Sequence, residues 1–174
     1  MSKFTHLDEA GQLRMVDVGG KPVTHRRATA LCRLEVGPRV FPLLLAGRLP
    51  KGDVWAAARL AGILAAKDTS RLIPLCHPLP LGAVDVEFTP EPEDCSVAIR
   101  ATVSTQAQTG VEMEALTAAA VAALTIYDMC KAVDRGLVIK ELLLLEKSGG
   151  AGGDWRRGQE TPEISSRSGR TGVK

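Results

Sequence analysis

The chain has 174 residues, of which 45% are hydrophobic and only 3% are aromatic, and its formal net charge is +2. This length suits one domain, and alanine, valine and leucine must fill the core because aromatic side chains are scarce. The near-neutral charge argues against general nucleic-acid binding through a strongly basic surface. We expect no apolar run to span a bilayer and find no signal-peptide core at the N-terminus, so the predicted location is the cytoplasm, with no membrane contact.

Four cysteines are scattered along the chain without a CxxC pair: Cys32, Cys76, Cys95 and Cys130. This spacing argues against a zinc site or a disulfide framework and favours reduced thiols.

The two ends of the chain are polar. Residues 1–13 should form a loose N-terminus, and the stretch after residue 148 is rich in Gly, Ser, Arg and Thr. We predict a single domain over residues 1–156 and a disordered tail over residues 157–174.

The first half of the chain predicts two strands and two helices. A short strand is expected at residues 15–18 and a longer one at residues 24–36. A short apolar helix should cover residues 41–49. Asp53 then stands at the N-cap position of a helix over residues 54–67, which is apolar nearly all round and should be buried on most sides.

The second half continues with strands and one long helix. Prolines make residues 72–81, LIPLCHPLPL, an extended rigid segment, because proline breaks helices and is disfavoured in central strands. Strands over residues 83–88 and 96–105 should pair as a hairpin. An alanine-rich helix is expected within residues 110–134, followed by a strand over residues 137–145.

The order of these elements predicts the fold. Strand, helix pair, strand, strand, helix and strand is the split βαβ order of an α+β, ferredoxin-like fold, with helices packed on one face of an antiparallel sheet. The helices are apolar on more sides than one such layer can bury, which favours a homo-oligomer.

The alanine-rich helix carries charges near both of its ends. Asp128 and Lys131 are one helical turn apart, which makes them either a candidate acid–base pair or an ordinary surface ion pair. Glu112 and Glu114 suit a helix N-terminus through the helix dipole. Because they are two residues apart, we expect at most one of them to point into any one pocket.

Other candidates are less specific on their own. His77 follows Cys76 in the rigid segment and could equally be a hydrogen-bonded loop histidine; no second Cys or His lies near enough in sequence to favour a metal site. Lys51 lies between Pro and Gly, where a lysine is commonly a solvated loop charge.

Two further lysines have ordinary structural explanations. Lys67 at the end of a buried helix would interact favourably with the helix dipole. Lys147 precedes a Gly-rich loop and can hold phosphate, although the GxxxxGK[ST] spacing of a P-loop is absent.

Several stretches together carry a resemblance. MVDV with Lys21, Thr24 and Arg26 downstream, then LIPLCHPL, GVEMEALTAAAVAALTIYDMCKAVD and LLLLEKSGG, resemble the molybdenum cofactor biosynthesis protein C family, the cyclic pyranopterin monophosphate synthases. The resemblance covers roughly residues 14–150. One departure is Ala151-Gly152-Gly153, where the family often has Lys-Ser-Gly; this removes one possible phosphate-binding cation.

The resemblance implies a lyase reaction. The substrate would be (8S)-3′,8-cyclo-7,8-dihydroguanosine 5′-triphosphate, made by an upstream radical enzyme, and the products cyclic pyranopterin monophosphate and diphosphate. It also implies a homohexamer built as a trimer of dimers, with the active site at a subunit interface. No redox cofactor is implied, although Mg²⁺ could accompany the triphosphate.

The resemblance also implies roles for individual residues. Asp128, Lys131 and Lys51 match the catalytic residues, which would move protons. Leu75, Cys76, His77, Met113 and Glu114, with Glu112 beside them, would bind the base and sugar. Arg26, Lys67 and Lys147 are candidates for phosphate contacts.

Two competing functions remain at this point. A nucleotide-sensing module on the same fold would bind the ligand without chemistry. A structural adaptor that docks the upstream enzyme would bind no substrate at all.

Overall fold

The computed structural model describes residues 11–159 and has an α+β, ferredoxin-like fold, as predicted. In chain order the elements are β1 (Thr24–Glu35), α1 (Gly37–Leu45), α2 (Val54–Leu72), β2 (Leu81–Glu91), the 3-10 turn η1 (Pro92–Asp94), β3 (Ser96–Ala107), α3 (Glu112–Cys130), β4 (Val138–Ser148) and β5 (Trp155–Arg156). The predicted loose N-terminus falls largely on residues 1–10 and the predicted disordered tail on residues 160–174, both outside the described part. Residues 157–159, which were included in that tail, instead form a turn in which the Arg157 N–H donates to the Leu145 carbonyl at 2.8 Å.

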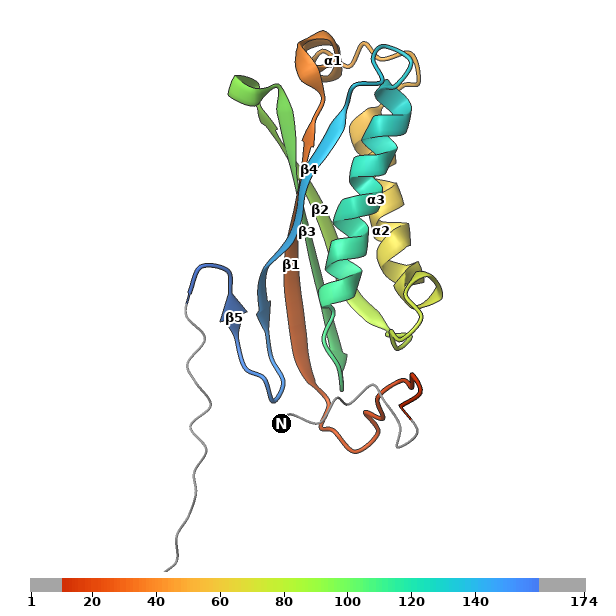
Figure 1. Ribbon diagram of the computed structural model, residues 1–174, viewed down its shortest axis with the longest axis vertical. Coiled ribbons are helices and arrows are strands. Elements are labelled where there is room, and N and C mark those ends of the chain that lie inside the picture. The colour runs from red at the N-terminus through yellow and green to blue at the C-terminus, as the bar shows by residue number, and fades with distance from the viewer. Residues whose placement is uncertain (1–10, 160–174) are drawn as a thin grey trace, which may run out of the picture.

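The strands form one antiparallel sheet in the order β2-β3-β1-β4-β5. The central strand β1 pairs with β3 over its whole length and with β4 on its other side. Helices α2 and α3 lie side by side and cover one face of the sheet (Figure 1). The chain crosses this face twice in opposite directions, so α2 ends near the point where α3 begins.

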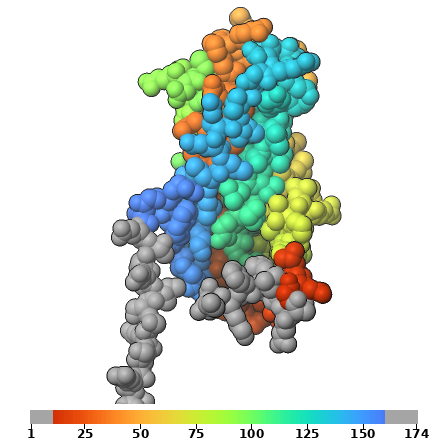
Figure 2. All heavy atoms as spheres, in the orientation of Figure 1, coloured from red at the N-terminus to blue at the C-terminus, as the bar shows by residue number. Residues whose placement is uncertain are grey.

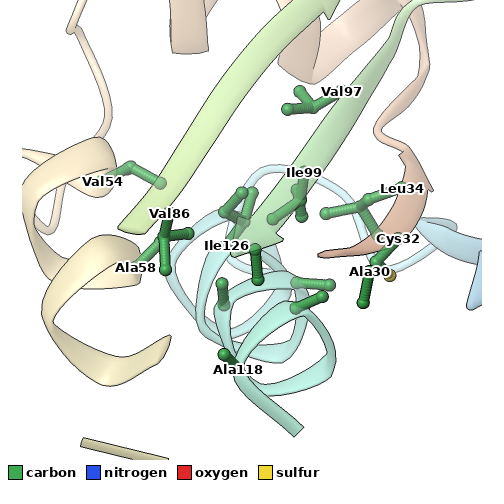
Figure 3. Packing of buried hydrophobic residues seen from close by; sticks show 14 of the residues in the cluster. Ala30, Cys32, Leu34, Val54, Ala58, Val86, Val97, Ile99, Ala118 and Ile126 are labelled. Carbon is green, nitrogen blue, oxygen red and sulfur yellow. The ribbon is translucent and has the colours of Figure 1, made fainter. Parts of the chain in front are cut away.

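The core lies between the sheet and α3. Alternate residues of the strands point toward the helices, because successive side chains of a strand face opposite sides of the sheet. Figure 3 shows Cys32 and Leu34 of β1 and Ile99 of β3 facing Ile126 of α3. Alanine lines most of the buried face of α3, which lets this helix lie close to the strands and to α2.

The structure explains where two of the helices begin. The Asp53 carboxylate accepts a hydrogen bond from the backbone N–H of Ala56 at 3.0 Å, so Asp53 is the predicted N-cap of α2. Helix α1 begins at Gly37, four residues before the predicted start. Pro38 stands in its first turn, where proline is favourable because its fixed φ suits a helix and its missing N–H is not needed.

Several predicted boundaries were wrong. Residues 15–18 form no strand; this segment instead runs across the end of the molecule and contributes to the pocket described below. Helix α2 continues to Leu72, five residues beyond the predicted end, so Lys67 lies inside the helix and not at its terminus. Leu72 therefore still belongs to the helix, residues 73–75 form a bend and a turn, and only residues 76–80 of the proline-rich segment run without regular secondary structure to the start of β2.

Helix α3 departs from the expectation that no run could span a bilayer. It has 19 residues and a mean hydropathy of 1.3, which satisfies a membrane span by length and composition. Half of it is buried inside the protein, against the sheet and α2, as in the core helix of a globular fold.

Candidate functional site

Two lysines surround one carboxylate at the C-terminal end of α3. The Asp128 Oδ1 accepts from Lys131 Nζ at 2.6 Å, and Oδ2 accepts from Lys51 Nζ at 2.8 Å. Lys51 comes from the loop between α1 and α2 and also donates to the backbone carbonyl of Asp128 at 2.9 Å. We call these three residues the lysine–aspartate cluster.

The charge balance of this cluster is unusual for a surface ion pair. Hydrogen bonds from Lys131 and then from Lys51 hold the pKa of Asp128 at about 2, so its carboxylate is ionised at neutral pH. Two ammonium groups share one negative charge, and all three side chains remain substantially open to solvent. The cluster therefore offers an anionic substrate one excess positive charge and several N–H donors.

A cavity of about 340 Å³ lies at the other end of α3. It is formed by the N-terminal segment, the proline-rich segment, the connection from β3 and the first turn of α3. Residues 11–20 lie at this end of the molecule, below the ends of the two long helices (Figure 2). We call it the glutamate pocket; its lining residues are Val16, Val18, Lys21, Leu75, Cys76, His77, Leu79, Thr109, Gly110, Glu112, Met113 and Glu114.

The proline-rich segment is fixed to its surroundings by hydrogen bonds. The Thr105 hydroxyl of β3 donates to the Pro80 carbonyl at 2.6 Å. The His77 Nε2 lies 2.9 Å from the Val16 carbonyl; because a carbonyl only accepts, Nε2 carries the proton. His77 is thus a hydrogen-bonded loop histidine and part of the pocket wall at the same time.

Both glutamates line the pocket, contrary to the prediction that only one would. Glu112 is the first residue of α3, and its side chain folds back over Gly110, where a Cβ would overlap Oε2. Residues two apart in a helix point to different sides of it. The pocket lies at the N-terminal end of α3, however, where the preceding chain is not helical, and Glu112 reaches the pocket by folding back over Gly110.

Glu114 is the buried member of the pair, with only 4% of its surface exposed. Burial raises its pKa, its own backbone N–H opposes this change, and the nearby Glu112 charge adds to it. Burial and the Glu114 charge likewise raise the pKa of the Cys76 thiol. The Glu114 carboxyl group can therefore be protonated more readily than an exposed one, and in its protonated form it can donate a hydrogen bond.

The three candidate phosphate ligands lie in different surroundings. Lys147, near the end of β4, has its Nζ 3.8 Å from Glu112 Oε1 and so borders the glutamate pocket. Arg26 donates to three backbone carbonyls on neighbouring segments. Lys67 is exposed on α2 and belongs to neither group of residues.

Apart from Arg26 and Lys67, the predicted site residues of one chain form two groups and not one. Glu112 and Asp128 are sixteen residues apart on a continuous helix, which corresponds to ~24 Å along its axis. The lysine–aspartate cluster and the glutamate pocket thus lie at opposite ends of α3. A single chain does not bring Lys51, Asp128 and Lys131 to His77.

Sequence reasoning missed half of the pocket lining. Lys21 and Thr109 contribute polar groups, and Val16, Val18 and Leu79 contribute apolar walls. Lys21 belongs to one of the stretches that carried the resemblance, which was a usable signal.

A metal centre finds no support in residues 11–159. No group of three His, Cys, Asp or Glu side chains there is placed to hold a metal ion. All four cysteines lie in this range and are free, and burial raises the pKa of the Cys32 and Cys130 thiols to about 11, which keeps them protonated.

Comparison with known proteins yields one family. The MoaC family profile matches residues 15–150. A cyclic pyranopterin monophosphate synthase of Pelotomaculum thermopropionicum is 58% identical over 161 residues, which is 92% of this chain and 95% of the relative. Proteins of the same name from Thermomicrobium roseum and Chloroflexus aurantiacus are 58% and 57% identical, each over 90% of this chain and over 95% and 96% of the relative.

Proposed function

Since the chain belongs to the MoaC family, we propose that it catalyses the cyclic pyranopterin monophosphate synthase reaction in an active site completed by a second copy of the chain. It is an enzyme of molybdenum cofactor biosynthesis and converts the cyclised dihydro-GTP into cyclic pyranopterin monophosphate and diphosphate. The observation that carries the proposal is the separation of two chemically complementary half-sites at the two ends of α3.

A stripe on the exposed side of α3 joins the two half-sites. Met113, Thr117, Ala120, Val121 and Leu124 lie on one side of the helix, within an arc of about 100°, and none of them is fully buried. Asp128 continues this α3 stripe at its C-terminal end. Met113 at the other end lines the glutamate pocket.

This α3 stripe supports a two-fold pairing of chains. Two copies of α3 packed antiparallel about an axis near Ala120 and Val121 would place Asp128 of each copy opposite Met113 of the other. Helices pack with axes about 8–10 Å apart, and small residues at the centre of the stripe favour close approach. Each lysine–aspartate cluster would then meet the glutamate pocket of its neighbour.

The completed site divides the work between the two half-sites. The glutamate pocket would bind the base and ribose, with Leu75, Cys76 and His77 on one side and Met113 and Glu114 on the other. A protonated Glu114 carboxyl could donate to an acceptor on the heterocycle, and its carboxylate could accept from ring N–H groups.

The lysine–aspartate cluster would carry the proton transfers. Opening the purine-derived ring and closing the pterin ring moves protons among nitrogen, oxygen and carbon, which positioned Lys and Asp side chains can assist. Asp128 would hold Lys51 and Lys131 in place with its carboxylate and take part in proton exchange between them.

The final step forms the cyclic phosphate. A ribose hydroxyl oxygen attacks the α-phosphorus and loses its proton to a basic group; the bond from that phosphorus to the bridging oxygen breaks, and diphosphate leaves with the electron pair. The Lys147 ammonium would leave the Glu112 carboxylate and bind a phosphate oxygen of the leaving group instead. Lys67, on the exposed side of α2, would contact the outer phosphates. Magnesium would enter as a counter-ion of the triphosphate.

The larger assembly and location follow the same reasoning. We place the enzyme in the cytoplasm as a homohexamer of three such pairs. Exposed Leu60 and Leu64 on the outer side of α2 supply further apolar surface for contacts between chains.

The experiment is direct turnover. The purified chain, incubated with substrate generated by the upstream radical enzyme, should release one diphosphate per pterin formed, measured by coupled diphosphate assay and by fluorescence of the oxidised pterin. Tight binding of the substrate without diphosphate release would identify a nucleotide-sensing module instead, and absence of binding in calorimetry would identify an adaptor.

A further inference from the structure

The Arg26 side chain donates hydrogen bonds to backbone carbonyls on both sides of the central strand β1. Its Nη1 donates to the Gly149 carbonyl at 3.3 Å, Nη2 donates to the Gln108 carbonyl at 3.2 Å, and Nε donates to the Ala107 carbonyl at 3.4 Å. All three guanidinium nitrogens therefore donate to backbone carbonyls at the last residue of β3, directly after β3, or directly after β4. This arrangement differs from that of a side chain held free for phosphate.

On the β4 side of the central strand, the Arg26 side chain continues the sheet past the last backbone pair. The β1–β4 ladder ends at the pair Arg27–Ser148. The Arg26 side chain then takes the place of a further backbone pair by binding the carbonyl of Gly149, the next residue. One planar guanidinium thus joins three segments, because its donors point in fixed directions.

Two glycines are required for this arrangement. Gly149 has a φ of 90° and Gly150 a φ of 78°, in the left-handed region that favours glycine. A Cβ on Gly149 would overlap the carbonyl oxygen of His25, and a Cβ on Gly150 would overlap Nη1 of Arg26. The loop after β4 is therefore shaped around the guanidinium.

The segments joined by Arg26 carry pocket residues. Gln108 precedes Thr109 and Gly110, which line the glutamate pocket. Gly149 lies two residues after Lys147, whose ammonium faces Glu112 across the pocket rim. Loss of the guanidinium would release the loop that fixes the end of β4 and, with it, the position of Lys147.

We propose that Arg26 is a positioning residue that sets Lys147 against the glutamate pocket by clamping the loop after β4 to the end of β3, and that it does not itself bind phosphate. The expected loss of kcat/KM rests on the proposed function. The clamp itself can be tested without substrate.

The kinetic test is a double-mutant cycle. Arg26→Lys keeps the positive charge but cannot reach three carbonyls, so kcat/KM should fall on the order of 10- to 100-fold through misplacement of Lys147. In a Lys147→Ala background the same substitution should have almost no further effect, because residues that act through one another are non-additive. Arg27→Lys, which changes the neighbouring residue on the opposite face of the sheet, is the matched control and should leave kcat/KM unchanged.

A second variant tests the same idea with the arginine retained. Gly150→Ala should displace the guanidinium by steric overlap, and the positive φ at this position adds backbone strain, so the loss of kcat/KM should be at least as large as for Arg26→Lys. Hydrogen exchange gives the substrate-free measurement: amides of residues 149–153 should exchange faster in both variants, while the core of the sheet keeps its protection.

The outcomes separate the two hypotheses. Full activity of Arg26→Lys, or equal losses in the wild-type and Lys147→Ala backgrounds, would overturn the positioning role and favour a direct phosphate contact. Unchanged exchange at residues 149–153 would overturn the clamp. A wild-type enzyme without turnover would refute the proposed function, whereas the exchange result would still decide whether the clamp exists.

Discussion

Replacing Lys131 by alanine is expected to lower turnover by about 10²–10⁴-fold, the range typical of a lost general acid or base. Lys131 makes the shorter of the two side-chain contacts to Asp128, at 2.6 Å, and stands at the C-cap of α3. Its removal takes away one of two ammonium groups and leaves Asp128 paired with Lys51 alone. The fold should survive, because exposed ion pairs contribute little to stability.

Diphosphate release and thermal unfolding, measured on the same preparation, check this prediction. The matched control is Lys140→Ala, which removes another exposed lysine from an ion pair, 2.8 Å from Glu35 on the sheet. The control should keep full turnover. A Lys131→Ala enzyme with normal turnover would contradict the assignment of the lysine–aspartate cluster to catalysis.

The second large effect is expected from Leu124→Arg. Leu124 is 54% exposed on a single chain and lies in the α3 stripe, so an arginine there costs the isolated fold little. Between two paired helices the same charge would be desolvated, and the carboxylate one turn away on this side of α3, that of Asp128, is already hydrogen-bonded to two lysines, so the change is strongly unfavourable. The paired assembly should dissociate, and turnover should fall at least about 100-fold because each chain then holds only half of a positioned site.

Light scattering coupled to size-exclusion chromatography, followed by turnover assays on the separated species, measures both effects. Leu45→Arg places the same charge on an exposed leucine of α1, away from the α3 stripe, and serves as the control. The control should keep the pairing and the turnover. Persistence of both in Leu124→Arg would show that the α3 stripe is not the surface at which chains meet.

Much of the fold could be predicted because local signals and the hydrophobic pattern agree. Asp53 marks the start of α2, alternation marks the β2–β3 hairpin, and the alanine-rich run marks α3. The errors arose where local signals compete. Residues 15–18 have the composition of a strand, but the sheet offers them no partner strand along that stretch, and they line a pocket instead.

The candidate site was less accessible to sequence reasoning. Lys51 and Asp128 are 77 residues apart, and their contact depends on where the loop before α2 meets the end of α3. No periodicity in the sequence encodes that meeting; the family resemblance suggested it. The sequence does indicate the length of α3, and this length places the two half-sites at opposite ends of the helix. That one half-site supplies cations and the other a pocket with carboxyl groups becomes clear only from the residues that the fold brings to each end.

The central claim, that one chain's lysine–aspartate cluster serves the partner's glutamate pocket, is tested most directly by complementation between two inactive variants. Lys131→Ala disables the cluster, and Cys76→Trp fills the pocket, so each pure variant should be inactive. Unfolding and refolding an equal mixture should restore about one quarter of wild-type turnover, since half of randomly formed two-fold pairs are mixed and each mixed pair has one intact site of two.

A mixture of Lys131→Ala with Asp128→Asn, both in the cluster, is the control and should stay inactive. Turnover of the first mixture no higher than that of the pure variants would contradict a shared site, and recovery near one quarter is the result that the paired arrangement predicts.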